Sequence, residues 1–128
     1  MHLLDTDVMI EYLRGSRETQ ETVDRLPELY TTHINLAELF YGAYKSGNVK
    51  RHLEKLRCFM EGVEVVHMSA ESAELYGRIK TVLNAKGKTA GDFDLLIASI
   101  CVANNLTIMT KNTSHYRDIP GLKIRSIG

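Results

Sequence analysis

The sequence predicts an α/β domain built around a parallel sheet, and three observations support that prediction. First, the apolar residues 3–4 run into two carboxylates, Asp5 and Asp7, as a buried strand does when it ends at a ligand-binding crevice. Second, β-prone segments alternate with segments of helical periodicity. Third, the 128 residues are 44% hydrophobic and 25% charged, which is typical of a globular chain and fits a single domain over residues 1–128.

Asp5 and Asp7 follow the first predicted strand. A carboxylate at the inner end of a buried strand is costly unless it is paired or bound to a metal ion, so Asp5 is the first candidate for a functional residue. Asp7, with Thr6, has an alternative interpretation as the N-cap of a helix over residues 8–13. We therefore expect further carboxylates at matching positions of the fold.

A second strand is predicted over residues 28–34, after a helix over residues 17–26, and it leads directly into a helix that begins at Asn35. Such a helix starts at the carboxyl edge of the sheet, the edge that presents Asp5, so Glu38 is expected to face Asp5 across the crevice. The alternative is a capping box, in which Asn35 caps the helix and Glu38 reaches back to the cap's backbone N–H.

The middle of the chain is predicted to form structural elements without candidate catalytic residues, and it contains one basic segment. Residues 45–57 contain five lysines and arginines and one acid, which fits either a phosphate-binding patch or a solvated helical face. Gly62 ends this helix, residues 63–66 are predicted to form a third strand, and Ser69 caps a long helix that runs to about residue 85.

Two more acids open a helix near residue 91 that is apolar nearly all round. A fourth parallel strand is predicted over residues 106–110, so the preceding helix must begin at the carboxyl edge of the sheet, and Asp94 is expected beside Asp5 and Glu38. In the simpler alternative, Asp92 caps the helix and Asp94 complements its dipole.

Polar residues also follow the fourth predicted strand at the same edge. Thr110 and Asn112 are expected to orient the carboxylates or to meet a phosphate, although ordinary turn chemistry also explains Asn112. A short last strand over residues 123–125 is expected at an edge of the sheet.

Several carboxylates without histidine pairs or nearby cysteines suit hard cations such as Mg²⁺ or Mn²⁺. Such a site activates water and holds the oxygens of a phosphodiester during in-line displacement, so hydrolysis of nucleic acid is the expected activity. The 16 basic and 16 acidic residues balance, so any polyanion must be met by local patches.

The compartment is expected to be the cytoplasm. Cys58 and Cys101 do not have metal-ligand spacing, and we expect both to be buried thiols in a reducing environment. The acids near the N-terminus argue against a secretory signal, and no apolar stretch approaches the roughly 20 residues that span a membrane.

The chain as a whole resembles PIN-domain ribonucleases, specifically VapC-type toxins. The resemblance is carried by the order and spacing of LLDTD (residues 3–7), NLAELFYGA (35–43), DFDLLIA (92–98), TKN (110–112) and IPGL (119–122). It implies a three-layer α/β/α sandwich with a parallel sheet of about five strands. It also implies endoribonuclease activity that depends on Mg²⁺ or Mn²⁺, commonly on tRNA or rRNA, a homodimer, and inhibition by a VapB-type antitoxin.

By this resemblance, Asp5, Glu38 and Asp94 are the three main metal-binding acids, and Thr110 and Asn112 match a conserved polar segment. Aromatic residues of the helix after the second strand, Phe40, Tyr41 and Tyr44, are the candidates for partner contact.

Two positions depart from the family pattern. Many relatives carry Asn where Asp7 stands. A fourth acid also commonly follows the T-x-N segment in an acid-Phe pattern, where this chain has His115 followed by Tyr116. His115 is therefore expected to weaken a second metal position, for which Asp7 or Asp92 could compensate, to ligate Mn²⁺, or to contact the scissile phosphate. The alternative is an exposed loop histidine without a role.

Two other functions compete with a nuclease. Asp5 and Asp7 fit the paired aspartates of haloacid-dehalogenase-like phosphatases, although the Thr and Lys motifs then stand in the wrong order relative to Asp92 and Asp94. The second alternative is a non-catalytic RNA-binding or interaction module, for which His115 is the best support.

Overall fold

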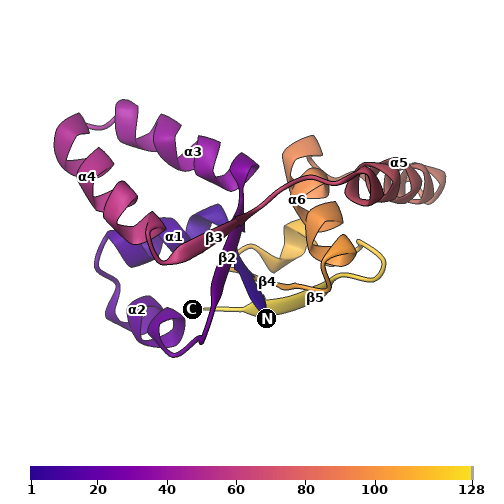
Figure 1. Cartoon of the computed structure of the whole chain (residues 1–128). Coiled ribbons are helices and arrows are strands. Elements are labelled where there is room, and N and C mark those ends of the chain that lie inside the picture. The colour runs from indigo at the N-terminus through magenta and orange to yellow at the C-terminus, as the bar shows by residue number, and fades with distance from the viewer. Residues whose placement is uncertain (128) are drawn as a thin grey trace.

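A parallel sheet forms the centre of the computed structural model, which describes residues 1–127 (Figure 1). Within these residues the sheet has five strands in the order β3-β2-β1-β4-β5, and every strand pairing is parallel. The strands are β1 (His2–Leu4), β2 (Leu29–Thr32), β3 (Val63–Val66), β4 (Thr107–Thr110) and β5 (Lys123–Ser126). The predicted parallel sheet and the edge position of the last strand are confirmed.

Helices cover both faces of this sheet, in the order α1 (Thr6–Leu13), α2 (Arg17–Asp24), α3 (His33–Tyr44), α4 (Val49–Met60), α5 (Ala70–Ala85) and α6 (Asp92–Ala103). Successive strand residues point to opposite faces, so Leu3 and Ile108 pack with α5 and α6. Leu4 and Met109 pack on the other face with residues of α1 to α4. Figure 1 shows α5 and α6 on one side of the sheet and α1 to α4 on the other, which confirms the three-layer α/β/α fold.

The helix starts differ from the sequence-based prediction in three places, because the cap residues lie elsewhere. Asp5 caps α1 through a side chain that accepts from Thr6 N–H, so Asp7 lies within the first turn and is not the cap. Thr32 caps α3 and accepts from Asn35 N–H, so the second strand ends at Thr32 and the capping box at Asn35 is wrong. Gly91 precedes α6 without a side-chain cap, so Asp92 is not a cap either.

The two cysteines have different environments. Cys101 is buried in α6, as predicted, and burial raises the pKa of its thiol well above the usual range. Cys58 is exposed on α4, so the prediction of a buried thiol is wrong there, because this face of the basic helix is turned to solvent. Among residues 1–127, no helix combines the length and apolar character that crossing a membrane requires.

Candidate active site

Asp5 lies at the carboxyl end of β1, the central strand, and only 8% of its surface is exposed. Its Oδ1 accepts hydrogen bonds from the Thr6 N–H (2.9 Å) and the Asn35 amide (3.1 Å). Its Oδ2 accepts from the Thr110 hydroxyl (2.8 Å) and the Tyr116 hydroxyl (3.0 Å). A carboxylate offers about four lone-pair positions, so these four donors use all of them and fix the orientation of Asp5.

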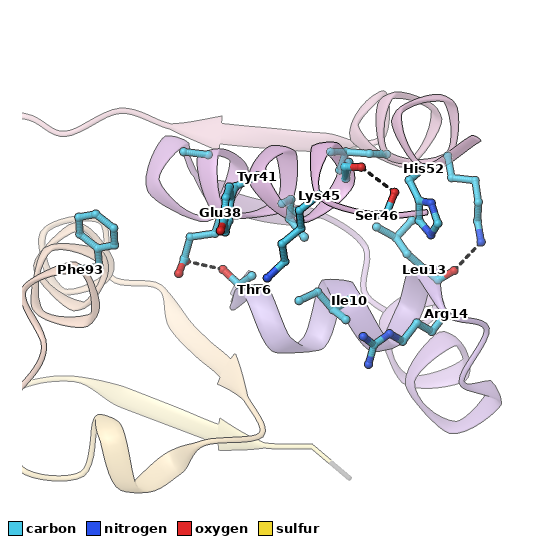
Figure 2. Close-up of a pocket in the computed structure, with 16 residues that line it drawn as sticks. Thr6, Ile10, Leu13, Arg14, Glu38, Tyr41, Lys45, Ser46, His52 and Phe93 are labelled. Atoms are coloured by element: carbon cyan, nitrogen blue, oxygen red, sulfur yellow. Dashed lines mark hydrogen bonds between the residues drawn. The ribbon is translucent and has the colours of Figure 1, made fainter. Parts of the chain in front are cut away.

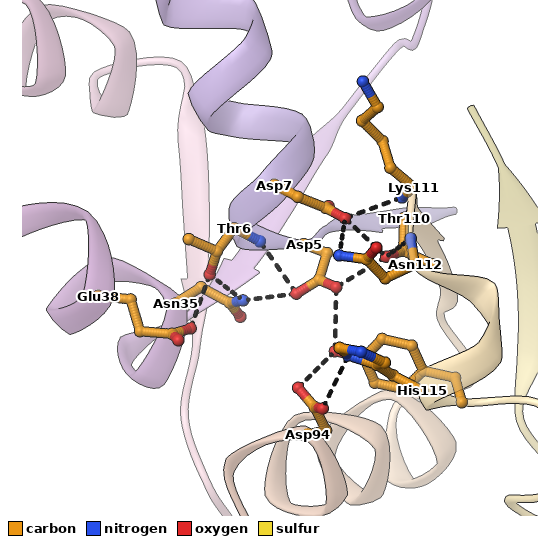
Figure 3. A network of polar contacts seen from close by, with 11 residues as sticks. Asp5, Thr6, Asp7, Asn35, Glu38, Asp94, Thr110, Lys111, Asn112 and His115 are labelled. Atoms are coloured by element: carbon orange, nitrogen blue, oxygen red, sulfur yellow. Dashed lines mark hydrogen bonds and ion pairs between the residues drawn. The ribbon is translucent and has the colours of Figure 1, made fainter. Parts of the chain in front are cut away.

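Asp94 lies in the first turn of α6, on the same edge of the sheet, as the topology argument predicted. Its Oδ1 is 3.3 Å from the hydroxyl oxygen of Tyr116, and its Oδ2 is 3.2 Å from Nδ1 of His115. Desolvation raises the pKa of the Asp94 carboxyl; His115 acts against this rise and the charge of Asp5 adds to it. Asp5 and Asp94 are therefore joined through one shared hydroxyl group (Figure 3).

Glu38 reaches the same network from α3, but indirectly. The Thr6 hydroxyl donates to Glu38 Oε1 at 2.7 Å, and the same hydroxyl accepts from the Asn35 amide at 2.9 Å. The second hydrogen of that amide goes to Asp5, so Thr6 and Asn35 connect Glu38 to Asp5 (Figure 3). Glu38 itself is exposed, and it lies on the Asp5 side of α3 as expected.

Asp7 is anchored by the segment that follows β4. Its Oδ2 accepts from the backbone N–H of Lys111 and from the Asn112 amide, both at 3.0 Å, and lies 3.3 Å from the Thr110 hydroxyl. Its Oδ1 is buried and has no hydrogen-bond partner. Desolvation, and then the charge of Asp5, raise the pKa of Asp7. Thr110 therefore contacts both Asp5 and Asp7, and Asn112 contacts Asp7.

Asp92 does not join these residues. Its carboxylate is exposed and accepts hydrogen bonds from Lys80 Nζ and the Tyr76 hydroxyl, both at 3.0 Å. The Lys80 ammonium holds the pKa of Asp92 below its usual range. The expectation that Asp92 supports the site is therefore wrong, because residues two apart on a helix point in directions about 200° apart. Only one of Asp92 and Asp94 can face the crevice.

Three members of the network were not predicted as functional residues: Thr6, Asn35 and Tyr116. Thr6 and Asn35 stood only as helix-capping candidates. Tyr116 stood only as the neighbour of His115, yet it is completely buried while its hydroxyl reaches both acids. The signal that could have found it is the acid-Phe pattern, because the aromatic half of that pattern falls on Tyr116.

The donor groups at this edge fit a hard divalent cation, although no three His, Cys, Asp or Glu side chains among residues 1–127 converge into a complete metal site. The unpartnered Asp7 Oδ1 is a buried oxygen without a hydrogen-bond donor, which is costly unless a cation supplies the missing partner. Desolvation and mutual repulsion also raise the pKa values of Asp7 and Asp94, and a bound cation relieves both costs. Oxygen donors of this kind suit Mg²⁺ and Mn²⁺.

A groove of about 880 Å³ opens beside the acids, between α1, α3 and α4 (Figure 2). Glu38 and Thr6 lie at its end next to the network, with Phe93 across from them. Apolar side chains line much of the groove, and basic residues, among them Lys45 and Arg14, lie along it. The groove thus leads from the carboxylates onto an apolar surface with a positive border.

Comparison with known proteins agrees with this geometry. The PIN domain family model matches residues 2–121, which is most of the chain. The chain therefore belongs to the PIN-domain family, and the alternative of a haloacid-dehalogenase-like phosphatase is wrong.

Individual relatives indicate which kind of PIN-domain protein this chain is. A ribonuclease VapC2 of Rickettsia felis is 32% identical over 126 residues, which cover 95% of this chain and 94% of that protein. A tRNA(fMet)-specific endonuclease VapC of Salmonella typhimurium is 34% identical over 124 residues, with 95% and 94% covered. The crystal structure of VapBC2 from Rickettsia felis bound to a promoter DNA fragment superimposes with a TM-score of 0.93 at 30% identity, covering 99% of this chain and 98% of that one. This chain is thus a VapC-type endoribonuclease toxin.

Proposed function

We propose that Asp5, Glu38 and Asp94 hold a Mg²⁺ or Mn²⁺ ion with which the protein hydrolyses RNA phosphodiester bonds. The observation that carries this proposal is the hydrogen-bonded network that links all three carboxylates through Tyr116, Asn35 and Thr6. A structural ion-pair cluster would place basic side chains among the acids. Here no lysine or arginine side chain within residues 1–127 is in hydrogen-bonding contact with the three acids, and His115 is the one histidine that contacts them.

The residues of the site have separate roles in such a reaction. A bound divalent cation supplies water activation and stabilisation of charge on the phosphate oxygens. Asp5 is held rigid by four donors, so it presents a fixed ligand. Glu38 is exposed and tied by one hydrogen bond, so it can move to meet a substrate phosphate and its cation. Asn112 and Thr110 keep Asp7 close to Asp5, which adds negative charge that favours a cation.

The proposed substrate is tRNA or rRNA, acted on in the cytoplasm. The relative in Salmonella typhimurium is named a tRNA(fMet)-specific endonuclease, which supports a tRNA among the candidates. The exposed positive border of the groove, with Lys45 and Arg14, offers contacts for a phosphate backbone next to the acids.

We further propose a homodimer and a VapB-type antitoxin as protein partners. Similar structures from Rickettsia felis and Salmonella typhimurium are VapBC complexes, which supports the antitoxin. The apolar groove that ends at Glu38 is the surface on which an inhibitory segment would cover the acids. Tyr41 and Tyr44 expose 68% and 60% of their surfaces on α3 and remain candidates for partner contact, whereas Phe40 packs against the core beside α1 and α4.

RNA cleavage with and without a divalent ion tests the proposed activity. Total RNA is incubated with the protein in Mg²⁺, in Mn²⁺ and in EDTA, and the new 5′ ends are sequenced. Cleavage at defined positions in Mg²⁺ or Mn²⁺, and none in EDTA, is expected. Asp94→Asn should lose this cleavage, whereas Asp118→Asn is the matched control, because Asp118 is exposed and its carboxylate is paired with Lys88 and not with the network of the acids. Equal cleavage in EDTA, or by Asp94→Asn, contradicts the proposal. No cleavage under any condition favours the non-catalytic alternative.

The proposed assembly has its own measurement. Light scattering at micromolar concentration should give twice the mass of the 14.5 kDa chain, and Tyr44→Glu should shift the protein to that single-chain mass if α3 forms the contact. A strictly monomeric wild type contradicts the proposed homodimer.

A further inference from the structure

Tyr116 is the one aromatic hydroxyl in contact with the acids of the site within residues 1–127. It follows β4 after a short 3-10 turn at Thr113–His115, and its ring is wholly buried in the core cluster that contains Leu3 and Ile108. Packing on this scale allows few ring orientations, so the position of the hydroxyl is fixed by the core and not by the site. The hydroxyl lies 3.0 Å from Asp5 Oδ2 and 3.3 Å from Asp94 Oδ1.

The lone pairs of Asp5 are fully used in this arrangement. Thr6 and Asn35 donate to one oxygen, and Thr110 and Tyr116 donate to the other. A cation that takes Asp5 as a ligand must therefore displace one of these four donors.

Three of the four donors are held by further contacts. The Thr6 donor is a backbone N–H at the start of α1. The Asn35 amide is clamped from its other end, because the Thr32 hydroxyl donates to Asn35 Oδ1 at 2.6 Å. The Thr110 hydroxyl makes the shorter bond to Asp5 Oδ2, at 2.8 Å, and also accepts from Asn112 N–H. The Asn35 amide and the Thr110 hydroxyl would lose or strain these other contacts on leaving, and the Thr6 N–H cannot leave without moving the backbone at the start of α1.

The Tyr116 hydroxyl differs from these three donors because it is shared between two carboxylates. Its hydroxyl has one hydrogen and lies within reach of two carboxylates, so it satisfies one of them well and leaves the other with an oxygen–oxygen contact. Of the four donors to Asp5, the Tyr116 hydroxyl is therefore the one whose loss costs the site least when a cation binds between Asp5 and Asp94.

We propose that the Tyr116 hydroxyl competes with the divalent cation for Asp5 and Asp94, so that this residue sets the metal affinity of the site. The proposal rests on the proposed function, because it takes Asp5 and Asp94 as metal ligands. In the metal-free protein the hydroxyl stabilises the paired acids, and in the metal-bound protein its O–H bond rotates away from Asp5 while the buried ring keeps its place. A phenylalanine at this position keeps the packing and removes the competitor.

The proposal makes two effects of Tyr116→Phe run in opposite directions. The metal-free protein should unfold at a lower temperature, because Asp5 loses a donor. Its affinity for Mn²⁺ should rise about threefold to tenfold, the factor that one ordinary hydrogen bond represents. A residue that only supports the acids would lower both quantities, so the direction of the affinity change separates the two roles.

Calorimetric titration of the intact wild-type protein and its variants with Mn²⁺ measures the affinity, and thermal unfolding in EDTA measures the stability. Tyr12→Phe is the matched control, because the Tyr12 hydroxyl also donates to a carboxylate, Asp24, but away from the acids. This control should leave Mn²⁺ affinity unchanged.

A near-ultraviolet difference spectrum on adding Mg²⁺ gives a second readout. Wild type and Tyr12→Phe should show a shift of the tyrosine band as Tyr116 loses its carboxylate acceptor, and Tyr116→Phe should not. Equal or weaker Mn²⁺ binding by Tyr116→Phe overturns the competition while leaving the proposed function in place. Failure of the wild type to bind Mn²⁺ at all overturns both.

Discussion

Nδ1 of His115 lies 3.2 Å from Oδ2 of Asp94, the oxygen that Tyr116 does not contact. The imidazole is about half exposed, at 54% of its side chain. The imidazole thus contacts Asp94 at the edge of the site, and a role for it stays a prediction.

Replacing His115 should change the metal requirement of cleavage. His115→Asp adds an oxygen donor next to Asp94, so we expect cleavage to reach half its maximal rate at a lower Mg²⁺ concentration than in the wild type. The same variant should be less stable in EDTA, since like charges then face each other. His115→Ala should retain cleavage and lose any preference for Mn²⁺ over Mg²⁺. Titration of the cleavage rate with each metal checks this, and a higher Mg²⁺ requirement in His115→Asp would contradict it.

Glu38→Gln and Asp5→Asn should separate activity from stability. Both changes remove a proposed ligand charge, so cleavage should fall about 100-fold or more in each. Only Asp5→Asn should also destabilise the fold, by about 1–3 kcal/mol, because its NH₂ group would face hydrogen-bond donors that now surround a carboxylate. Glu38 is exposed, so Glu38→Gln should change the free energy of unfolding by no more than about 0.5 kcal/mol. Urea unfolding beside cleavage assays measures both; unchanged cleavage by Glu38→Gln would remove it from the proposed ligands.

Asp7→Asn should stabilise the metal-free protein at neutral pH. The pKa of Asp7 is raised in the fold, first by desolvation and then by Asp5, so the native state binds this proton more readily than the unfolded chain does. Ionised Asp7 therefore costs stability at pH 7, and the wild type recovers that stability as the pH falls through the raised pKa. The difference in melting temperature between Asp7→Asn and wild type in EDTA should shrink toward acid pH. A lower melting temperature for the variant at pH 7 would show that its hydrogen bonds outweigh its charge.

Asp92→Asn should leave cleavage unchanged, because Asp92 is bonded to Lys80 and Tyr76 and faces away from the acids. Asp94→Asn, two residues further along the same helix, is the natural comparison. Initial cleavage rates of the two variants on the same RNA test this contrast, and a large loss in Asp92→Asn would mean that the charge at the start of α6 matters beyond its contacts.

The sequence was sufficient for the positions that depend on strand order. Parallel strands end at one edge, so the convergence of Asp5, Asp94 and Thr110 follows from the order of the elements along the chain. The direction of a side chain within a helical turn does not follow from this order. The prediction for Asp92 is wrong because residue spacing, and not the edge of the sheet, decides which way a helical side chain points. The single-domain organisation over residues 1–128 stays a prediction.

Tyr116 and Asn35, which connect the acids, could not be predicted from the sequence for a related reason. Tyr116 lies in an irregular segment after β4, where no hydrophobic period indicates which side chains turn inward. Asn is a preferred N-cap residue, so the sequence indicates Asn35 as the cap of its helix. In the structure Thr32 caps α3, which leaves the Asn35 amide free to donate to Asp5 and Thr6. Local propensity therefore indicates a helix cap at Asn35 and gives no signal at Tyr116.

The strand order has a consequence for how the protein is made. β1 lies between β2 and β4, so β1 is synthesised well before its neighbour β4. Asp5 receives two of its four donors from Thr110 and Tyr116, which are 105 and 111 residues away. A nascent chain that has not yet exposed Tyr116 cannot hold Asp5 in its final geometry. Assembly of the acids is thus delayed until the chain has been synthesised through Tyr116.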